Sequence, residues 1–320
     1  MKFCSYLLRD INFEPACIQP CCDVHGIGVP QFPFTGGELD IEAYKRHITN
    51  VFWSLQEHPE YCTGCPELRE ASVSFETEND KDVGKFMQIR TVSFNQHRFF
   101  CNCRCVYCSL WSTRQKEPVY PVLPAVKTLA ASGILHKEAF FSWGGGEPTI
   151  LAEFDEACSW IHKQGYFQNI HTSALRYSAS VAAILARRSG KINISLDAGS
   201  PETYAKVKGV KGWGKVTNTL RQYMEAAATP NQIDLKYIIF EANNQLTEIA
   251  AFLKLCQRLS LKYVQYSLDF REVNQQSLSK KTLIAAAFFR KHAQELGMTA
   301  TPFFIDAPLL KAISDLEKSL

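Results

Sequence analysis

This sequence lacks three features that would point to a membrane, to export or to a nucleic-acid partner. No apolar run approaches the length of a membrane span, and the N-terminus lacks the charged-then-apolar layout of a signal peptide. Neither sign of charge dominates, because 35 Lys and Arg balance 32 Asp and Glu in 320 residues. The net charge of +3 gives no electrostatic reason to bind a membrane surface or nucleic acid. We therefore expect a protein of the reducing cytoplasm.

Cysteine, in contrast, is abundant and unevenly distributed. Ten of the twelve cysteines precede residue 110. In a reducing compartment such clustering indicates metal binding rather than disulfides. Cys158 and Cys256 stand alone within helical patterns, where a buried free thiol is expected.

The tightest cluster is Cys101, Cys105 and Cys108, spaced C-x3-C-x2-C, with Tyr107 just before the last cysteine. Three thiolates on one short loop can hold three corners of a cubane iron–sulfur cluster and leave the fourth iron without a protein ligand. Such an open iron is a site for chemistry. A zinc knuckle is the alternative, since closely spaced cysteine pairs also suit zinc.

A glycine-rich turn, Gly144-Gly145-Gly146-Glu147-Pro148, follows a predicted strand over 139–143. Glycines at the end of a buried strand let backbone groups approach a ligand closely, and the proline fixes the exit of the chain. A phosphate-binding loop is disfavoured, because no Lys-Ser/Thr follows and Glu147 would repel phosphate.

Together, the cysteine spacing and the Gly-Gly-Glu-Pro turn resemble the two signatures of the radical S-adenosylmethionine (SAM) superfamily. The resemblance implies an oxygen-sensitive enzyme that cleaves SAM with one electron to methionine and a 5′-deoxyadenosyl radical, which abstracts hydrogen from a substrate. It assigns a [4Fe-4S] cluster to Cys101, Cys105 and Cys108. The residues that it assigns to SAM around these motifs are Tyr107, Gly145, Gly146, Glu147 and Pro148.

From Met87 onward, short apolar runs alternate with helical patterns, as in the βα units of a parallel sheet. Six strands are predicted, over 88–93, 139–143, 168–172, 191–197, 233–240 and 262–268. Six units are too few to close an eight-stranded barrel, and the resemblance also implies an open six-stranded one. The predicted fold class is therefore α/β: a partial (β/α)6 TIM-type barrel over 87–320 after a small cysteine-rich domain over 1–86.

The segment 1–86 contains one predicted amphipathic helix, over 40–56, and a polar linker over 67–85. Its thin core would gain stability from a bound metal. The segment resembles the auxiliary-cluster modules of the SPASM and Twitch type, although those usually follow the barrel. A second [4Fe-4S] cluster is predicted here, with structural zinc as the alternative. The predicted ligands are Cys4, Cys22, Cys62 and Cys65, with Cys21 as the rival of Cys22 and Cys17 as a spare.

Polar and apolar residues alternate along the predicted strand 191–197, which places Asn193, Ser195 and Asp197 on one face. Polar groups buried there need partners or a ligand. The resemblance assigns this strand to the ribose and carboxylate of SAM, with Ser195 and Asp197 at the matching positions. Lys236, in the strand over 233–240, would meet the SAM carboxylate or pair with an acid such as Asp197.

Candidate substrate contacts come from the carboxyl ends of the predicted strands, where ligands gather in such sheets. For His171 a purely structural role is the alternative. The candidates are Trp143, His171, Gln265, Asp269 and Arg271.

The predicted activity is hydrogen abstraction from a peptide or protein during maturation of a modified peptide. A carbohydrate or other small metabolite is the alternative substrate, and methyl transfer to RNA is disfavoured because no basic patch is visible. An alternative of another class is a non-catalytic metal-binding module on a degenerate barrel. The implied partners are SAM, an electron donor such as flavodoxin or ferredoxin, and the substrate.

Overall fold

The computed structural model describes residues 1–21, 28–65, 67–70, 81–113 and 118–320. The chain forms two compact units, each built from segments that are not contiguous in sequence. Unit 1 comprises Met1–Phe99, Gln115–Gly146 and Glu156–Gln168. Unit 2 comprises Phe100–Arg114, Glu147–Asp155 and Asn169–Leu320.

Unit 1 contains a mixed sheet whose strands run in the order β7-β6-β2-β3-β4. The strands are β2 (Asp10–Glu14), β3 (Cys17–Gln19), β4 (Phe32–Pro33), β6 (Ile89–Phe94) and β7 (Leu135–Trp143). β2, β6 and β7 are parallel, while β3 and β4 join antiparallel. Ile11 of β2 pairs with Val92 of β6, which pairs with Phe141 of β7, and all three side chains are buried. The N-terminal segment therefore supplies a strand next to the first strand predicted for the barrel.

The predicted helix over 40–56 is present as α2 (Ile41–Glu57). Asp40 caps it by accepting a hydrogen bond from the Ala43 amide at 2.9 Å, as acidic N-cap residues do. The apolar face of α2 is buried, as its spacing predicts. The other elements here are β1 (Lys2–Cys4), which pairs antiparallel with β5 (Leu68–Glu70), and α1 (Tyr6–Arg9), the 3-10 segments η1 (Pro59–Cys62) and η3 (Val83–Phe86), and α3 (Leu123–Ala131).

Unit 2 contains four parallel strands in the order β9-β10-β11-β12. They are β9 (Gly190–Ser195), β10 (Ile233–Ile239), β11 (Tyr263–Leu268) and β12 (Thr299–Pro302). Alternate side chains along β9 and β10 are buried, including Ile192, Ile194 and Leu235. Two elements are shared between the units in sequence: α4 (Phe154–Lys163) and β8 (Phe167–His171).

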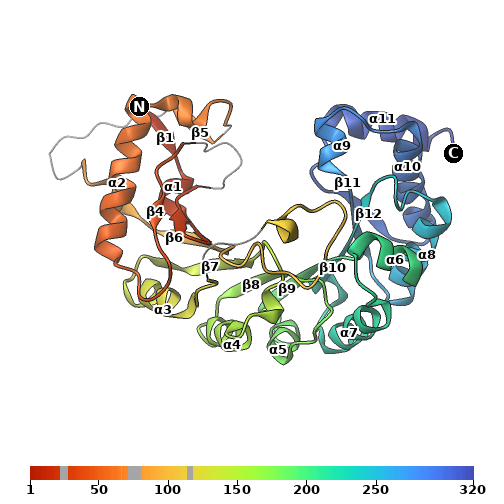
Figure 1. Cartoon of the computed structure of the whole chain (residues 1–320), viewed down its shortest axis with the longest axis horizontal. Coiled ribbons are helices and arrows are strands. Elements are labelled where there is room, and N and C mark those ends of the chain that lie inside the picture. The colour runs from red at the N-terminus through yellow and green to blue at the C-terminus, as the bar shows by residue number, and fades with distance from the viewer. Residues whose placement is uncertain (22–27, 66, 71–80, 114–117) are drawn as a thin grey trace. The chain divides into compact units, whose positions relative to one another are not determined.

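Helices separate the strands of unit 2, as expected of βα units. Helix α10 packs against α8 and α11 (Figure 1). The helices are α5 (Ala179–Ala186), α6 (Pro201–Lys208), α7 (Trp213–Ala226), α8 (Leu246–Arg258), α9 (Phe270–Asn274), α10 (Lys280–Glu295) and α11 (Ala307–Glu317). Three 3-10 segments complete the list: η4 (Leu110–Ser112), η5 (Pro148–Ile150) and η6 (Pro230–Gln232).

The structure confirms the predicted α/β class, with mostly parallel strands consistent with a partial barrel. The six predicted strands correspond to β6, β7, β8, β9, β10 and β11, whereas β2 and β12 were not predicted. The functional division into 1–86 and 87–320 stays a prediction. Among the residues described, no helix combines the length and apolar character needed to cross a bilayer.

Candidate functional site

The three clustered thiols lie on what we call the cysteine loop, residues 101–108 of unit 2. The last turn of α6 holds this loop through two backbone hydrogen bonds. The Arg104 amide donates to the Lys208 carbonyl at 2.9 Å, and the Val106 amide donates to the Val207 carbonyl at 3.0 Å. The loop backbone is therefore fixed by a helix end.

The loop exposes three thiols in part and buries the fourth. Cys101, Cys105 and Cys108 are partly exposed, whereas Cys103 is only 3% exposed. The Cys103 thiol hydrogen-bonds to the thiols of Cys101 and Cys105. These hydrogen bonds lower the pKa of Cys101 and bring the pKa of Cys105 to about 6, where the nearby Lys208 charge adds to the effect. A lowered pKa favours the thiolate, which is the form that binds metal.

The residues of the loop fit a [4Fe-4S] cluster by donor type, order and exposure. In the described ranges, no three His, Cys, Asp or Glu side chains are placed to hold a single metal ion. A cubane takes its thiolates one to each iron, around a core larger than one ion. The accessible thiols of Cys101, Cys105 and Cys108 are the three that the sequence assigns to such a core.

Behind the loop, Tyr107, Asp197 and Lys208 form a buried polar triad. The Tyr107 hydroxyl donates to Asp197 Oδ2 at 2.7 Å, and Lys208 Nζ donates to the Tyr107 oxygen at 2.7 Å. Lys208 also ion-pairs with Asp197, whose other oxygen accepts from the Ile238 amide at 2.7 Å. Burial alone would lower the pKa of Lys208, but the Asp197 carboxylate and the Cys105 and Cys103 thiolates together outweigh burial and raise that pKa. The triad ties the cysteine loop to the ends of β9 and α6.

The triad bears on two sequence predictions. The Asp197 carboxylate, assigned to SAM by resemblance, already binds the chain's own groups. Its ion-pair partner is Lys208 rather than Lys236. Lys208 was missed because a lysine in the last turn of a helix normally needs no partner beyond the helix carbonyls.

Glu147 performs a similar anchoring role in the glycine-rich turn. Its side chain is buried, and the carboxylate accepts hydrogen bonds from the Thr149 amide (3.1 Å), the Thr149 hydroxyl (2.6 Å), the Thr172 hydroxyl (2.9 Å) and the Ser173 amide. The Glu147 amide donates to the Phe100 carbonyl at 2.9 Å, next to the first cysteine. The side chain thus holds the loops together, and Pro148 begins the 3-10 segment η5.

Gly145 must be glycine for two reasons. Its φ of +78° lies in the left-handed region, and a Cβ there would come within 2.8 Å of the Arg98 backbone. Gly146 follows and is partly exposed. The turn can therefore present bare backbone to a ligand, as the sequence predicts.

A polar row crosses three strands of unit 2. The strand register places Ser195 of β9 beside Lys236 of β10, and Lys236 beside Gln265 of β11. All three side chains are half-buried, and for Ser195 this matches the alternation seen along 191–197. Lys236 Nζ lies 4.6 Å from the centroid of the Phe303 ring. A hydroxyl, an ammonium and an amide in a row can bind a carboxylate.

The Asp269–Arg271 pair makes contact with the cysteine loop. Arg271 Nη2 lies 2.5 Å from Asp269 Oδ2, and Arg271 Nη1 donates to the Val106 carbonyl at 2.9 Å. Asp269 also caps α9 by accepting from the Arg271 amide at 2.9 Å. The pair therefore holds α9 to the loop.

The two remaining substrate candidates differ in exposure. His171 is exposed at the end of β8, with its Nε2 3.1 Å from Nδ2 of Asn169. Trp143 is fully buried in unit 1, where its Nε1 donates to Gln168 Oε1 at 3.1 Å. Trp143 thus packs in the core, and only His171 is open to a ligand.

The N-terminal thiols also gather. Cys4, Cys21 and Cys62 are buried, Cys65 is partly exposed, and the Cys65 amide donates to the Cys62 carbonyl at 3.0 Å. Burial raises the pKa of Cys4 to about 11, and the neighbouring thiols of Cys65 and Cys21 raise it further. Cys22 lies outside the described residues, so the structure places only its rival, Cys21, near Cys4.

Comparisons with known proteins agree with these motifs. The family model described as "Radical SAM superfamily" matches residues 95–266. A probable GTP 3′,8-cyclase of Saccharolobus islandicus is 22% identical over 172 residues, which cover 51% of this chain and 52% of the relative. The mycofactocin maturase MftC of Mycolicibacterium smegmatis is 26% identical over 155 residues, which cover 48% and 39%. The chain spans about half the length of the cyclase and less of MftC.

Among solved structures, SuiB of Streptococcus suis bound to its precursor peptide SuiA superimposes with a TM-score of 0.53. The match covers 99% of this chain and 75% of SuiB at 13% sequence identity, so the likeness is one of fold.

Proposed function

This chain belongs to the radical SAM superfamily, a family of enzymes that bind SAM at a [4Fe-4S] cluster, and we propose that it uses this chemistry to modify a peptide. A cluster held by Cys101, Cys105 and Cys108 would supply the one electron needed to cleave SAM to methionine and a 5′-deoxyadenosyl radical that takes a hydrogen atom from the substrate. The observation that carries the proposal is that the cysteine loop presents three accessible thiols. Its backbone is held in place by two hydrogen bonds to the last turn of α6.

The chain's own groups hold and shield the reactants. Cys101, Cys105 and Cys108 would ligate the cluster, and the buried Cys103 lies behind them. The Tyr107–Asp197–Lys208 triad fixes the loop from inside, and Arg271 holds its Val106 carbonyl. A loop fixed on both sides limits the motion of a cluster relative to its substrate, which favours a productive geometry.

Two features each suit a part of SAM: the glycine-rich turn and, within unit 2, the polar row. The bare backbone at Gly145 and Gly146 suits the amino group of SAM, with Glu147 and Pro148 positioning the turn. In the polar row, Ser195 and Lys236 are half-buried and suit the ribose and the carboxylate. Tyr107 and Asp197 would contribute by placing the loop rather than by direct contact.

In unit 1, a second cluster would take its ligands from Cys4, Cys62 and Cys65 together with Cys21 or Cys22. The proximity of Cys21 and Cys65 to Cys4 supports one shared site. Zinc is the alternative occupant, because four thiolates suit it equally well. Metal analysis of the intact protein distinguishes the two.

A peptide is the substrate that the comparisons favour. SuiB, which shares the fold over almost this whole chain, is solved with a precursor peptide bound, and MftC is named as a maturase. We propose that Gln265 and His171, both accessible from the strand ends of unit 2, contact this peptide. A nucleotide or another small metabolite is the second candidate, supported by the similarity to a probable GTP 3′,8-cyclase.

The test uses a short peptide encoded beside this gene, synthesised with deuterated side chains. Anaerobically reconstituted protein, SAM and dithionite should move deuterium into 5′-deoxyadenosine, and the peptide should change mass. The Cys105→Ala variant should do neither. Release of 5′-deoxyadenosine without deuterium, whichever neighbouring peptide is supplied, would reject the peptide and leave the small metabolite.

A further inference from the structure

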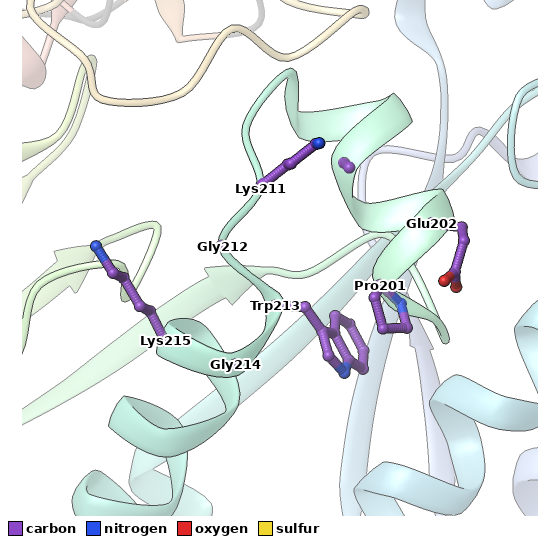
Figure 2. A pocket seen from close by; sticks show the side chains of 8 residues that line it. Pro201, Glu202, Lys211, Gly212, Trp213, Gly214 and Lys215 are labelled. Carbon is purple, nitrogen blue, oxygen red and sulfur yellow. The ribbon is translucent and has the colours of Figure 1, made fainter.

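A hollow in unit 2 lies beside the helix that holds the cysteine loop. It has a volume of about 510 Å³ and opens between the start of α6 and the start of α7. Figure 2 shows Trp213 next to Pro201, with Lys211 extending from the segment that joins the two helices and Lys215 from the first turn of α7. None of these residues has a role in the function proposed above.

The surface around this hollow carries excess positive charge. Lys211 and Lys215 line it, and both are exposed. Lys206 on α6 and Arg104 on the cysteine loop are exposed as well. In the part of the chain that the structure describes, none of these four cations forms an ion pair, and Glu202 is the acid that lines the hollow with them. Unpaired cations around an aromatic side chain fit an acidic protein partner.

A short packed path joins this surface to the cysteine loop. The Trp213 ring lies edge-on to the Tyr204 ring, with centroids 5.8 Å apart. Tyr204 is only 1% exposed, and Cys103 and Cys105 are among the acidic groups that act on its hydroxyl. At Gly209 an added Cβ would come within 2.6 Å of the Arg104 carbonyl, so the segment after α6 touches the loop. Trp213 thus packs on the buried Tyr204, and the segment that joins α6 to α7 contacts the loop where Gly209 meets Arg104.

We propose that this hollow, with Lys211 and Lys215 in its lining and the exposed Lys206 and Arg104 on α6 and the cysteine loop, docks the electron donor, a small acidic protein that carries a reduced flavin or iron–sulfur centre. The inference rests on the proposed function and adds the place where the electron enters. One electron leaves the donor, which is oxidised, and reaches the cluster on the loop, which is reduced; no bond forms or breaks. Trp213 would act as the aromatic anchor of the interface, inside a ring of lysines that steers the encounter.

The position of the hollow favours a redox partner over a substrate. A substrate must reach SAM, and the polar row proposed for SAM lies on strands β9, β10 and β11 rather than on α6 and α7. An electron crosses packed protein, and its transfer rate falls steeply with distance, so a donor needs only to approach the loop from outside. The residues that line the hollow include none of those proposed to bind SAM or the substrate.

The test measures how fast reduced flavodoxin, an acidic FMN protein, reduces the reconstituted enzyme in an anaerobic stopped-flow instrument. Cluster absorbance reports the electron transfer directly, without turnover. We expect a second-order rate constant that falls as salt increases, and at least a roughly tenfold lower value for Lys211→Glu/Lys215→Glu. Trp213→Ala should raise the flavodoxin concentration at which the reduction rate saturates. Trp213→Phe, which keeps an aromatic ring, should reverse part of this rise. The matched control Lys254→Glu/Lys262→Glu, also exposed in unit 2, should stay within about twofold of wild type.

Reduction by dithionite distinguishes a failure of the docking site from a failure of the proposed function, because a small reductant needs no docking surface. The readout is the ratio of flavodoxin-driven to dithionite-driven reduction, which corrects for any variant with less cluster. A ratio that is unchanged in Lys211→Glu/Lys215→Glu, or lowered equally in the control, overturns the docking site. So does a wild-type rate insensitive to salt, or competition by an acidic peptide substrate. Failure of dithionite to release 5′-deoxyadenosine from SAM would instead overturn the proposed function.

Discussion

Lys208 and Asp197, at the ends of α6 and β9, form a buried ion pair to which the Tyr107 hydroxyl is hydrogen-bonded on both sides. The Asp197 backbone has a φ of +57°, which is uncommon for a residue with a side chain. Asn243 supports this conformation by donating to the Asp197 carbonyl at 2.9 Å. The pair therefore fixes the backbone from which the cysteine loop is held.

Removing one partner of this pair should be much worse than removing both. Lys208→Met leaves the Asp197 carboxylate buried without its cation, which costs about 3–5 kcal/mol of unfolding free energy. In the double variant Lys208→Met/Asp197→Asn, neither charge remains, and part of the loss should be recovered. Denaturant titration of all three proteins measures this. Equal stability of Lys208→Met and wild type would show that the pair contributes nothing.

Glu147→Gln tests the carboxylate that anchors the glycine-rich turn. Four hydrogen-bond donors point at it, and an amide nitrogen cannot accept from them. We expect a loss of about 1–3 kcal/mol in unfolding free energy and weaker SAM binding by calorimetry. Glu156→Gln, at an exposed position of α4, is the matched control and should change neither. If Glu147→Gln binds SAM as tightly as wild type, the anchoring of the turn by Glu147 does not contribute to SAM binding.

Cys103 should be dispensable as a ligand despite lying between two of the proposed ones. Its thiol is buried, and it hydrogen-bonds to Cys101 and Cys105. Cys103→Ala should therefore keep the iron and sulfide content of the wild-type loop cluster, while Cys108→Ala should lose it. Iron and acid-labile sulfide assays after anaerobic reconstitution measure this. The metal bound at the N-terminal cysteines should be the same in both variants and serves as the internal reference. An iron loss in Cys103→Ala equal to that in Cys108→Ala would change the ligand set.

The buried carboxyl group of Asp10 should make the stability of unit 1 depend on pH. Burial raises the pKa of its carboxyl to about 6 from an ordinary value of 3.8, although the Thr91 hydrogen bond and the Arg9 charge act against the rise. The folded state thus binds the extra proton between these two values, so unfolding free energy falls as pH rises through this window. Asp10→Asn should be more stable than wild type above pH 6, by at most about 3 kcal/mol.

The gain from Asp10→Asn should shrink as the pH falls below 6 and vanish near 4, where the wild-type carboxyl is itself neutral. Thermal unfolding of both proteins across this range measures the difference. If the extra stability of Asp10→Asn is the same at every pH, it comes from a change in packing and not from the titration of Asp10.

Sequence periodicity predicted the elements that follow simple rules. Alternation along 191–197 predicted a polar face that includes Ser195, and this side chain is half-buried on β9. The cysteine spacing predicted Cys101, Cys105 and Cys108 as cluster ligands, which stays a prediction, and the three thiols are partly exposed. In each of these cases the information lies within one short segment.

The features that were missed depend on segments distant in sequence. Strand β2 was not predicted, because its pairing with β6 joins residues about 80 positions apart. The ion pair between Lys208 and Asp197 forms only because the chain after β9 turns back and brings the end of α6 beside Asp197. A lysine at the end of a helix does not by itself indicate such a partner. The resemblance assigns Asp197 to SAM, which stays a prediction, and nothing in the sequence indicates that its carboxylate binds Tyr107 and Lys208 within the chain.

The account as a whole depends on a cluster at Cys101, Cys105 and Cys108 that cleaves SAM. The most direct measurement is the release of 5′-deoxyadenosine from SAM by anaerobically reconstituted protein and dithionite, with iron and zinc determined on the same samples. Wild type should release it, and Cys105→Ala should not. Undiminished release by Cys105→Ala, or a wild-type protein that binds zinc alone and leaves SAM intact, would contradict the account.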